Sequence, residues 1–491
     1  MGSSRGRFRI GIPIGHRKGS TGGGSAAGPS TRLLVARTSM FLGYLALLGE
    51  PGAACAGDSS APGKTPEEKV PEQRIASRPG PEGPAAIDPG APQDPTGAEP
   101  PAEPSSPADP ITIAGGAKNY LNLALDALMA AGGSTAPDIQ LVEPGGHDPN
   151  QDGFTLQVVE MVFSGAVDPY FTAQANVVLQ MDSEGETIVE LEEAYATTSS
   201  LPANLQAKAG MYFTEFGRLN PQHPHAWDFV DVALVNADIL GSEGLRNPGA
   251  RLSWLMPTPV YSEFFLAVQD SQGETAQGFR WVEGEEIYGR PIQERTVHDL
   301  SDMLFVPRWS GSFDLTDNQT LVLGASGAFG PNGTGQNAST HIYGADLFWK
   351  WKAPTAQAGF PFVKSQTEAM LQRYEAGEFS ADEDGDGTVD LVLPRQTVET
   401  WGAYTQVLWG FHRGWVAGLR GDYVTEESAD LPQDSVRPTQ WRVSTNVTWY
   451  PTEFSKLRLQ YNHDDIRGTG PESSVWLQFE FLLGAHAAHK F

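Results

Sequence analysis

The chain has 491 residues, a formal net charge of −27, 19% charged residues, a single cysteine and many glycines (55) and aromatic residues (10%). So acidic a chain is a poor partner for nucleic acid, and one cysteine excludes a disulfide framework and a cysteine-ligated metal site. No stretch reaches the roughly 18 to 20 apolar residues of a membrane-spanning helix, which excludes a helical membrane protein, whereas transmembrane β-strands need only about 9 to 11 residues of alternating character.

Residues 1–56 have the layout of a secretory signal peptide. Residues 1–49 contain arginine and lysine but no acid, residues 40–48 are mostly apolar, and small residues follow at 52–56. A basic region, an apolar core and a cleavage site of small residues are typical of exported chains, so we expect this segment to be removed on export. A second interpretation stays open, in which Cys55 is the acylated cysteine of a lipoprotein.

Residues 57–115 are dominated by proline, alanine, glycine and glutamate and hold almost no aromatic or β-branched residues. A segment with so little apolar surface cannot offset the chain entropy that is lost on ordering. We therefore predict a disordered, Pro-rich periplasmic linker.

From residue 116 to residue 491 the sequence consists of short alternating runs separated by turn residues. In the last run, the odd positions from Val475 to Leu483 are apolar, whereas Gln478 and Glu480 between them are polar. Period-two alternation with one apolar face predicts strands long enough to cross a bilayer. We place about 16 strands, at residues 118–128, 153–166, 170–182, 186–198, 204–215, 249–256, 261–270, 303–314, 320–330, 339–352, 360–374, 401–411, 415–423, 441–449, 456–462 and 475–491.

The connections between these runs favour a membrane barrel. Alternate connections are short turns, such as 167–169, 257–260 and 451–455, and most of the others are long, which is typical of outer-membrane barrels. The fold class that we predict for residues 116–491 is all-β, a transmembrane antiparallel β-barrel of about 16 strands. A secreted β-sandwich or propeller is the soluble alternative, although neither needs so many apolar faces.

The predicted location is the cell outer membrane, with its lipid and lipopolysaccharide as surroundings. We expect the barrel-assembly machinery to recognise the terminal Phe491 and the apolar residues of the last strand. Porins of about 16 strands are often trimers, so a homo-oligomer is a further expectation by analogy.

Two histidines stand out in a predicted outer loop. His223 and His225 lie two residues apart, with Asp228 and Asp231 nearby, and imidazole and carboxylate groups are ligands of Zn²⁺. The alternative is that prolines and aromatic residues at 221–229 pack this loop over or into the barrel, with the histidines as polar filler.

A second acidic loop has the spacing of a calcium site. Alternate acids around a glycine, as in D-x-D-x-D-G-x-x-D, converge on one Ca²⁺ ion in calcium loops. The twelfth position here is Leu393 rather than glutamate, so a solvated acidic loop is the alternative. The predicted ligands are Asp382, Asp384, Asp386 and Asp390.

Charged residues at the positions that alternate with apolar ones should point into the lumen, where they tune selectivity. The alternative is that they pair across strands and stiffen the wall. The predicted pore-lining residues are Lys208, Lys350, Lys352, Arg420, Asp422, Arg442, Lys456, Arg458 and Glu480.

Several long motifs occur in an order that is similar to a known family. They are GFTLQVVEMVFSGAVDPYF (153–171), ELEEAYATT (190–198), FTEFGRLNPQHPHAWDFVD (213–231), GLRNPGARLSWLMPTPVYSEFFLAVQ (244–269), GASGAFGPNGTG (324–335), GADLFWKWK (344–352) and LLGAHAAHKF (482–491). Over residues 117–491 the chain resembles the porin-like outer-membrane β-barrel family whose members are often labelled zinc-regulated TonB-dependent outer-membrane receptors. The resemblance implies a porin-like architecture.

Three functions follow from these observations. The first is a porin-like channel for passive passage of small hydrophilic solutes or ions, narrowed by folded loops such as 217–248. The second is a substrate-specific receptor, zinc-related and TonB-dependent, although such receptors carry a folded plug inside a 22-stranded barrel. The third is an outer-membrane hydrolase, but no motif requires an enzyme, and no cofactor beyond structural Ca²⁺ or Zn²⁺ is expected.

Overall fold

The structure is a computed structural model that describes residues 110–115, 119–166, 168–182, 185–280, 286–293, 297–382, 385–428, 437–466, 468 and 470–484. The predicted signal peptide with Cys55, nearly all of the predicted linker, and Phe491 lie outside these ranges. No helix in these ranges is both long enough and apolar enough to cross a membrane.

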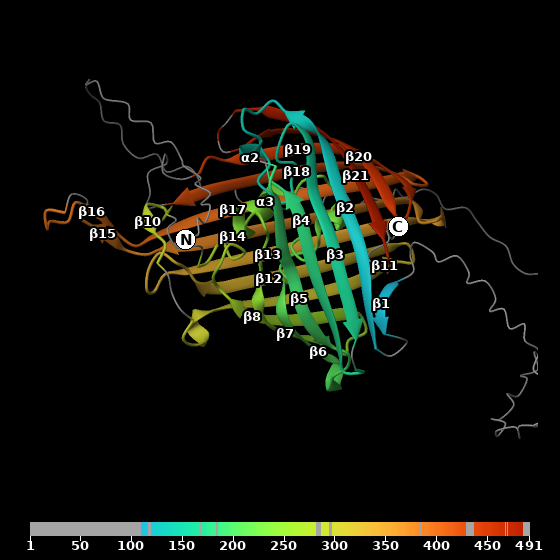
Figure 1. The fold of residues 1–491 in the computed structure, drawn as a ribbon, viewed down its shortest axis with the longest axis horizontal. Coiled ribbons are helices and arrows are strands. Elements are labelled where there is room, and N and C mark those ends of the chain that lie inside the picture. The colour runs from blue at the N-terminus through green and yellow to red at the C-terminus, as the bar shows by residue number, and fades with distance from the viewer. Residues whose placement is uncertain are drawn as a thin grey trace, which may run out of the picture. The chain divides into compact units, whose positions relative to one another are not determined.

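Sixteen antiparallel strands of the described ranges close into a barrel (Figure 1). Each strand of the wall pairs with the next one along the chain, and the last closes on the first, with Leu483 opposite Leu125. The wall consists of β2 (Tyr120–Ser134), β3 (Gly153–Ala166), β4 (Phe171–Met181), β5 (Thr187–Thr198), β6 (Leu205–Phe213), β7 (Arg246–Leu255), β8 (Tyr261–Asp270), β11 (Met303–Thr316), β12 (Gln319–Pro331), β13 (Ser339–Gln357), β14 (Phe360–Ala376), β17 (Gln396–His412), β18 (Trp415–Ser428), β19 (Gln440–Thr452), β20 (Ser455–Asp465) and β21 (Glu472–Leu483).

The remaining elements are short. β1 (Ile111–Gly115) adds a seventeenth strand to the sheet by pairing with the first residues of β2. The pairs β9–β10 and β15–β16 form small hairpins in long connections. The other elements are β9 (Glu286–Ile287), β10 (Arg290–Pro291), β15 (Phe379–Ala381), β16 (Leu391–Leu393), α2 (Ile139–Val142), α3 (Leu234–Leu240) and three single 3-10 turns at Pro202–Asn204, Pro224–Ala226 and Leu300–Asp302.

The predicted strands are all present, and the bounds of β3 and β8 are as predicted. Some strands, such as β13, β14 and β17, are longer than predicted, whereas β4, β5 and β6 are slightly shorter. β2 continues to Ser134 through two alanines and two glycines that carry no alternating signal. Backbone pairing with β3 and β21 keeps these residues extended, because an antiparallel ladder satisfies their N–H and C=O groups whatever the side chain.

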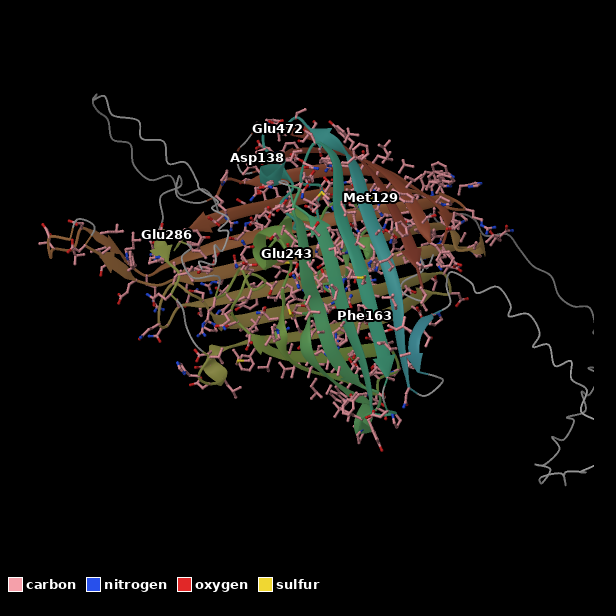
Figure 2. The ribbon with its side chains drawn as sticks, viewed as in Figure 1. Met129, Asp138, Phe163, Glu243, Glu286 and Glu472 are labelled. Carbon is pink, nitrogen blue, oxygen red and sulfur yellow. The ribbon has the colours of Figure 1, made fainter. Side chains whose placement is uncertain are left out.

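The wall has an apolar outer face and a polar inner face. In β19, Val443, Val447 and Trp449 are between 40% and 45% exposed, whereas Arg442 and Ser444 are fully buried. Figure 2 shows side chains on both faces of the wall, and Met129 of β2 is 45% exposed on the outer one. A soluble protein does not expose an apolar surface of this extent.

The connections differ at the two ends of the barrel. Those after β3, β5, β7, β11, β13, β17 and β19 are short turns at one end. Most connections at the other end are long, and the hairpin of β15 and β16 projects there, at the left of Figure 1. This asymmetry is as predicted from the sequence.

Residues 214–245, which we call the lumen segment, connect β6 to β7 and fold into the barrel. Their apolar residues, among them Phe216 and most of α3, pack against inner-facing wall residues such as Ile342 and Tyr404. On the opposite side of the wall, Oε1 of Glu160 in β3 lies 3.1 Å from Nδ1 of His223. The segment therefore reaches across the lumen, and the prediction that this loop narrows the barrel is confirmed.

Candidate metal centre

The lumen segment presents two histidines to the wall. His223 is the N-cap of the 3-10 turn Pro224–Ala226, and its carbonyl accepts a hydrogen bond from the amide of Ala226 at 2.9 Å. This tight turn stacks the rings of His223 and His225, with 5.8 Å between the centroids and 15° between the planes. Both rings therefore face the same part of the wall.

Four carboxylates of the wall lie opposite these rings. Asp126 of β2 and Glu160 of β3 are direct cross-strand partners. Glu192 and Glu193 are neighbours in β5, and both are buried, although successive residues of a strand normally point to opposite faces. A β-bulge accounts for this, because the pairing of β5 with β4 slips between Asn176 and its next residue.

Glu160 is shared by two groups of ligand atoms. In the first group, Nδ1 of His223 lies 3.1 Å from Oε1 of Glu160 and 2.9 Å from Oε2 of Glu192. In the second group, Nδ1 of His225 lies 3.0 Å from Oδ2 of Asp126 and 3.1 Å from Oε2 of Glu160. Each group contains three ligand atoms within 4.8 Å of one another.

A third histidine, His147, adjoins these two groups. We call the three histidines and the carboxylates beside them the cluster. His147, in the connection between β2 and β3, places Nε2 at 3.3 Å from Oε1 of Glu192 and 3.6 Å from Oε2 of Glu243. Imidazoles and carboxylates thus alternate from Glu243 to Asp126 through the interior of the barrel.

The carboxylates of the cluster face histidines. Within the described residues, no lysine or arginine nitrogen lies within 4.0 Å of the carboxylate oxygens of Asp126, Glu160, Glu192 or Glu193. Burial lowers the pKa of His225, but the carboxylates of Asp126 and Glu160 raise it to about 9. The pKa of His223 also lies well above its usual range, because Glu160 and Glu192 outweigh the effect of burial. The cluster therefore attracts protons or metal cations.

Residues around the cluster orient its members. The side-chain amide of Asn176 donates to Oε1 of Glu160, and Oε2 of Glu193 lies 2.9 Å from Nε2 of His223. Oε1 of Glu193 in turn accepts from the amide of Phe213 at 2.9 Å. Such outer partners fix the ring orientation of metal-binding histidines.

The sequence pointed to the two histidines and missed the carboxylates. Asp228 and Asp231 do not join the histidines: Asp228 pairs with Lys364 at 2.7 Å, and Asp231 pairs with Arg420 at 3.0 Å. The signal that could have found the wall ligands is a lone acid in an apolar strand, as for Asp126 in LALDALM and Glu160 in VVEMVF.

The predicted pore-lining charges lie on the inner face of the wall, and most of them contact other side chains or the lumen segment. Lys208 pairs with Glu215 at 3.1 Å, and Lys350 lies over the ring of Phe362, with 5.4 Å between Nζ and the centroid. Lys352 lies two residues after Lys350 on β13 and is therefore on the same face of the strand. Their role in selectivity stays a prediction.

The remaining six predicted charges are almost fully buried. Arg420 pairs with Asp422 at 2.8 Å, and Arg442 pairs with Glu143 at 2.8 Å. Lys456 pairs with Glu480 and donates to the carbonyl of His225 at 2.7 Å, and Arg458 donates to Gln478 at 3.0 Å. These groups fix the lumen segment to the wall.

The predicted calcium loop lies in the hairpin of β15 and β16. Asp382 accepts from the amides of Gly385 and Gly387 at 2.7 and 2.8 Å, and Gly387 has a φ of 90° that favours glycine. Asp386 accepts from the amide of Thr388 at 2.7 Å. Asp384 lies outside the described residues, and the backbone amide of Asp390 donates a hydrogen bond to the carbonyl oxygen of Ala381 at 3.0 Å. Calcium binding here stays a prediction.

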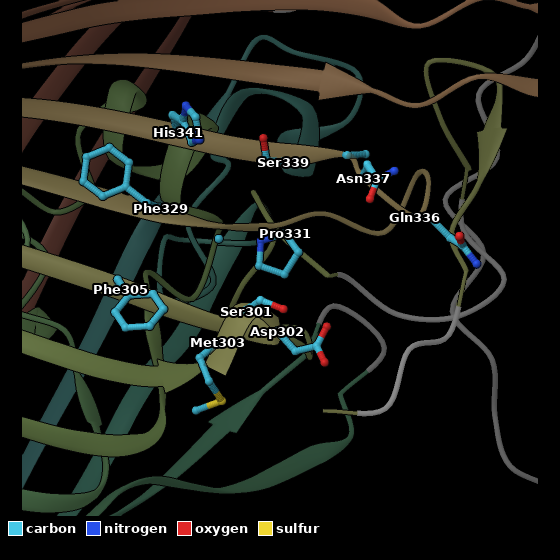
Figure 3. Close-up of a pocket in the computed structure, with 12 residues that line it drawn as sticks. Ser301, Asp302, Met303, Phe305, Phe329, Pro331, Gln336, Asn337, Ser339 and His341 are labelled. Carbon is cyan, nitrogen blue, oxygen red and sulfur yellow. The ribbon is translucent and has the colours of Figure 1, made fainter. Parts of the chain in front are cut away.

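A cavity of about 420 Å³ lies between the ends of β11, β12 and β13. Figure 3 shows residues that line it. Phe305, Phe329 and His341, which line it, alternate along their strands with residues that are buried against the lumen segment. The cavity therefore opens on the outer face of the barrel and is not part of a passage through it.

Comparisons with known proteins found a relative in sequence and several similar solved structures. The chain is 32% identical over 374 residues to an uncharacterized protein of Aquifex aeolicus, and the match covers 71% of this chain and 73% of that protein. No protein-family model matches the chain.

Among solved structures, the chain is similar to the outer-membrane channel DcaP of Acinetobacter baumannii, with 12% identity, a TM-score of 0.49, and coverage of 75% of this chain and 99% of that one. It is also similar to a loop-deletion mutant of OmpT, an outer-membrane protein of Vibrio cholerae, with 8% identity, a TM-score of 0.42, and coverage of 74% and 100%.

Proposed function

We propose that this chain, which belongs to the same family as the uncharacterized protein of Aquifex aeolicus, is a porin-like channel of the outer membrane that passes small hydrophilic solutes or ions passively. The observation that carries this proposal is the polarity of the closed wall, apolar outside and charged inside. A wall of this kind is stable with lipid around it and water or polar groups within it.

The exposed apolar residues support the membrane location. Trp415 and Trp449 are each about 40% exposed at or near strand ends, where aromatic residues meet the lipid headgroups of a membrane. Lipid and lipopolysaccharide are therefore the surroundings that we propose for the outer face. Folding by the barrel-assembly machinery and assembly into a homo-oligomer belong to the same proposal.

The lumen segment sets the width of the proposed passage. It contacts the wall on opposite sides, through Glu160 of β3 at His223 and through Lys364 of β14 at Asp228. Solutes must therefore pass beside this segment, and we expect a conductance below that of an unobstructed barrel of sixteen strands.

Planar-bilayer recordings test the proposal. The full chain, purified in detergent and added to a bilayer, should give steady single-channel current steps at constant voltage. The same protein unfolded by heat is the control for detergent leaks. Insertion of folded barrels without current steps would contradict a channel.

A second candidate function is a metal-linked receptor that is coupled to TonB. The observation in its favour is the cluster of histidines and carboxylates inside the barrel. A closed barrel that binds Zn²⁺ saturably, and whose binding is lost when both His223 and His225 are replaced, would favour the receptor over the channel.

A further inference from the structure

We propose that the cluster binds two divalent transition-metal cations, such as Zn²⁺, and that Glu160 bridges them. His223 and Glu192 complete one position, and His225 and Asp126 complete the other. This inference goes beyond the channel and depends only on the side chains of the cluster, so it holds or fails separately from solute passage.

The first argument is charge. Asp126, Glu160, Glu192 and Glu193 carry four negative charges when ionised, and each is at most 5% exposed. Buried carboxylates need a compensating charge, since an unpaired buried ion is costly. Two divalent cations balance four carboxylates and leave the imidazoles neutral, as metal ligands require.

The second argument is the hydrogen bonding of His223. A neutral imidazole carries one proton, and if Nε2 donates it to Glu193 at 2.9 Å, Nδ1 presents a lone pair. That lone pair faces oxygens of Glu160 and Glu192 at 3.1 and 2.9 Å, which also present lone pairs. A cation between these three atoms would take the place of the proton that the same carboxylates hold on the imidazole without metal.

The third argument is geometry. Ligand atoms bound at about 2.0 to 2.1 Å around a tetrahedral Zn²⁺ ion lie roughly 3.3 Å apart. The four distances from Nδ1 of His223 and of His225 to their carboxylate oxygens are between 2.9 and 3.1 Å, so small movements are enough to admit an ion.

The bridge follows from the two oxygens of Glu160. Oε1 belongs to the group of His223 and Oε2 to the group of His225. The parallel stacking of the two rings places these groups side by side. Two-metal sites hold their ions about 3.5 to 4 Å apart, a separation that one carboxylate can span.

Buried side-chain atoms without hydrogen bonds also support a bound cation. Both carboxylate oxygens of Asp126 and of Glu192, and Nδ1 of His223, have no hydrogen bond of acceptable geometry within the described residues, although all three side chains are buried or nearly so. Buried polar atoms without such bonds point to a bound ion or water.

Metal stoichiometry tests the proposal. The full chain, refolded in detergent without metal and then dialysed against Zn²⁺, should retain two ions per chain by elemental analysis. His223→Asn and His225→Asn should each retain one ion, and Glu160→Gln should retain none. His463→Asn, on the outer face, is the matched control and should retain two.

A further variant separates a ligand from an orienting residue. Glu193→Gln should weaken Zn²⁺ binding at the His223 position by about 10- to 100-fold and leave the other position unchanged. Co²⁺ in place of Zn²⁺ gives an absorption spectrum that reports the two positions separately.

Heat-modifiable gel migration shows whether each variant has folded, and Asp126→Asn and Glu192→Gln address the same two positions if a histidine variant fails to fold. If the wild-type chain retains no more Zn²⁺ than Glu160→Gln does, the proposal is overturned. Protonated histidines would then supply the counter-charge. A single ion lost equally in every variant would overturn the bridge. Neither result depends on whether the barrel conducts.

Discussion

Asp231 should be the residue on which docking of the lumen segment depends most. Its carboxylate is buried and contacts Arg420 at 3.0 Å, Gln460 at 2.7 Å and Asn462 at 3.1 Å, and it also pairs with Arg442. Asp231→Asn removes the negative charge between two buried guanidinium groups while keeping the size of the side chain.

The cost of this change follows from the partners that remain. Breaking a buried ion pair costs about 3 to 5 kcal/mol when a charge is left uncompensated. Arg420 keeps Asp422, and Arg442 keeps Glu143, so the lower end of the range, about 3 kcal/mol, applies. Because about 1.4 kcal/mol corresponds to a factor of ten, the undocked population should rise about 100-fold.

Trypsin cleavage at Arg218 in the lumen segment measures this population. Cleavage follows the equilibrium fraction of the open form when opening and closing are fast. The cleavage rate for Asp231→Asn should therefore be about 100-fold above that of wild type. Its single-channel currents should also be larger and noisier. Asp228→Asn is the matched control, because its partner Lys364 is 26% exposed and the pair is worth about 1 kcal/mol or less. Equal cleavage rates for wild type, Asp231→Asn and Asp228→Asn would refute the reasoning.

Three further predictions concern pH, the lipid face and packing. Burial raises the pKa of Asp231, but Arg420 and Arg442 lower it below its usual value, so its contribution to docking is present above about pH 4 and is lost only as the pH falls further. The difference in single-channel conductance between wild type and Asp231→Asn should therefore stay constant from pH 8 to about pH 4 and shrink below that, and a difference that changes near neutral pH would contradict this. Leu459→Arg, on the outer face in the middle of β20, should destabilise the barrel in lipid by about 2 to 4 kcal/mol, and Leu483→Arg at a strand end by about 0 to 1 kcal/mol, in urea titrations of the bilayer-inserted protein. Gly344→Ala would place a Cβ at 2.8 Å from the ring of Phe216 and should weaken the docking free energy of the lumen segment by about 1 to 3 kcal/mol. Trypsin cleavage should then be faster. Gly421→Ala is the control and should leave the rate unchanged, because its Cβ would meet no atom within 4 Å.

The wall of the barrel could be predicted from the sequence because its signal is local. A strand between lipid and a polar interior must alternate with period two, as in Val443 to Trp449, and each short turn marks a change of direction. These signals predicted the sixteen strands, and the same parity indicated which charges, such as Arg442, point inward. Strand ends without alternation, such as residues 130–134 of β2, were missed because backbone pairing alone keeps them extended.

The candidate metal centre depended on tertiary structure. His223 and His225 were recognisable as neighbours in sequence, but Asp126, Glu160 and Glu192 join them only because the lumen segment folds back against β2, β3 and β5. The bulge that turns Glu192 and Glu193 to the same side breaks the rule by which a sequence assigns strand faces. Alternation within a strand therefore determined the wall of this protein, whereas the closure of the barrel and the path of one loop decided which charges meet inside it.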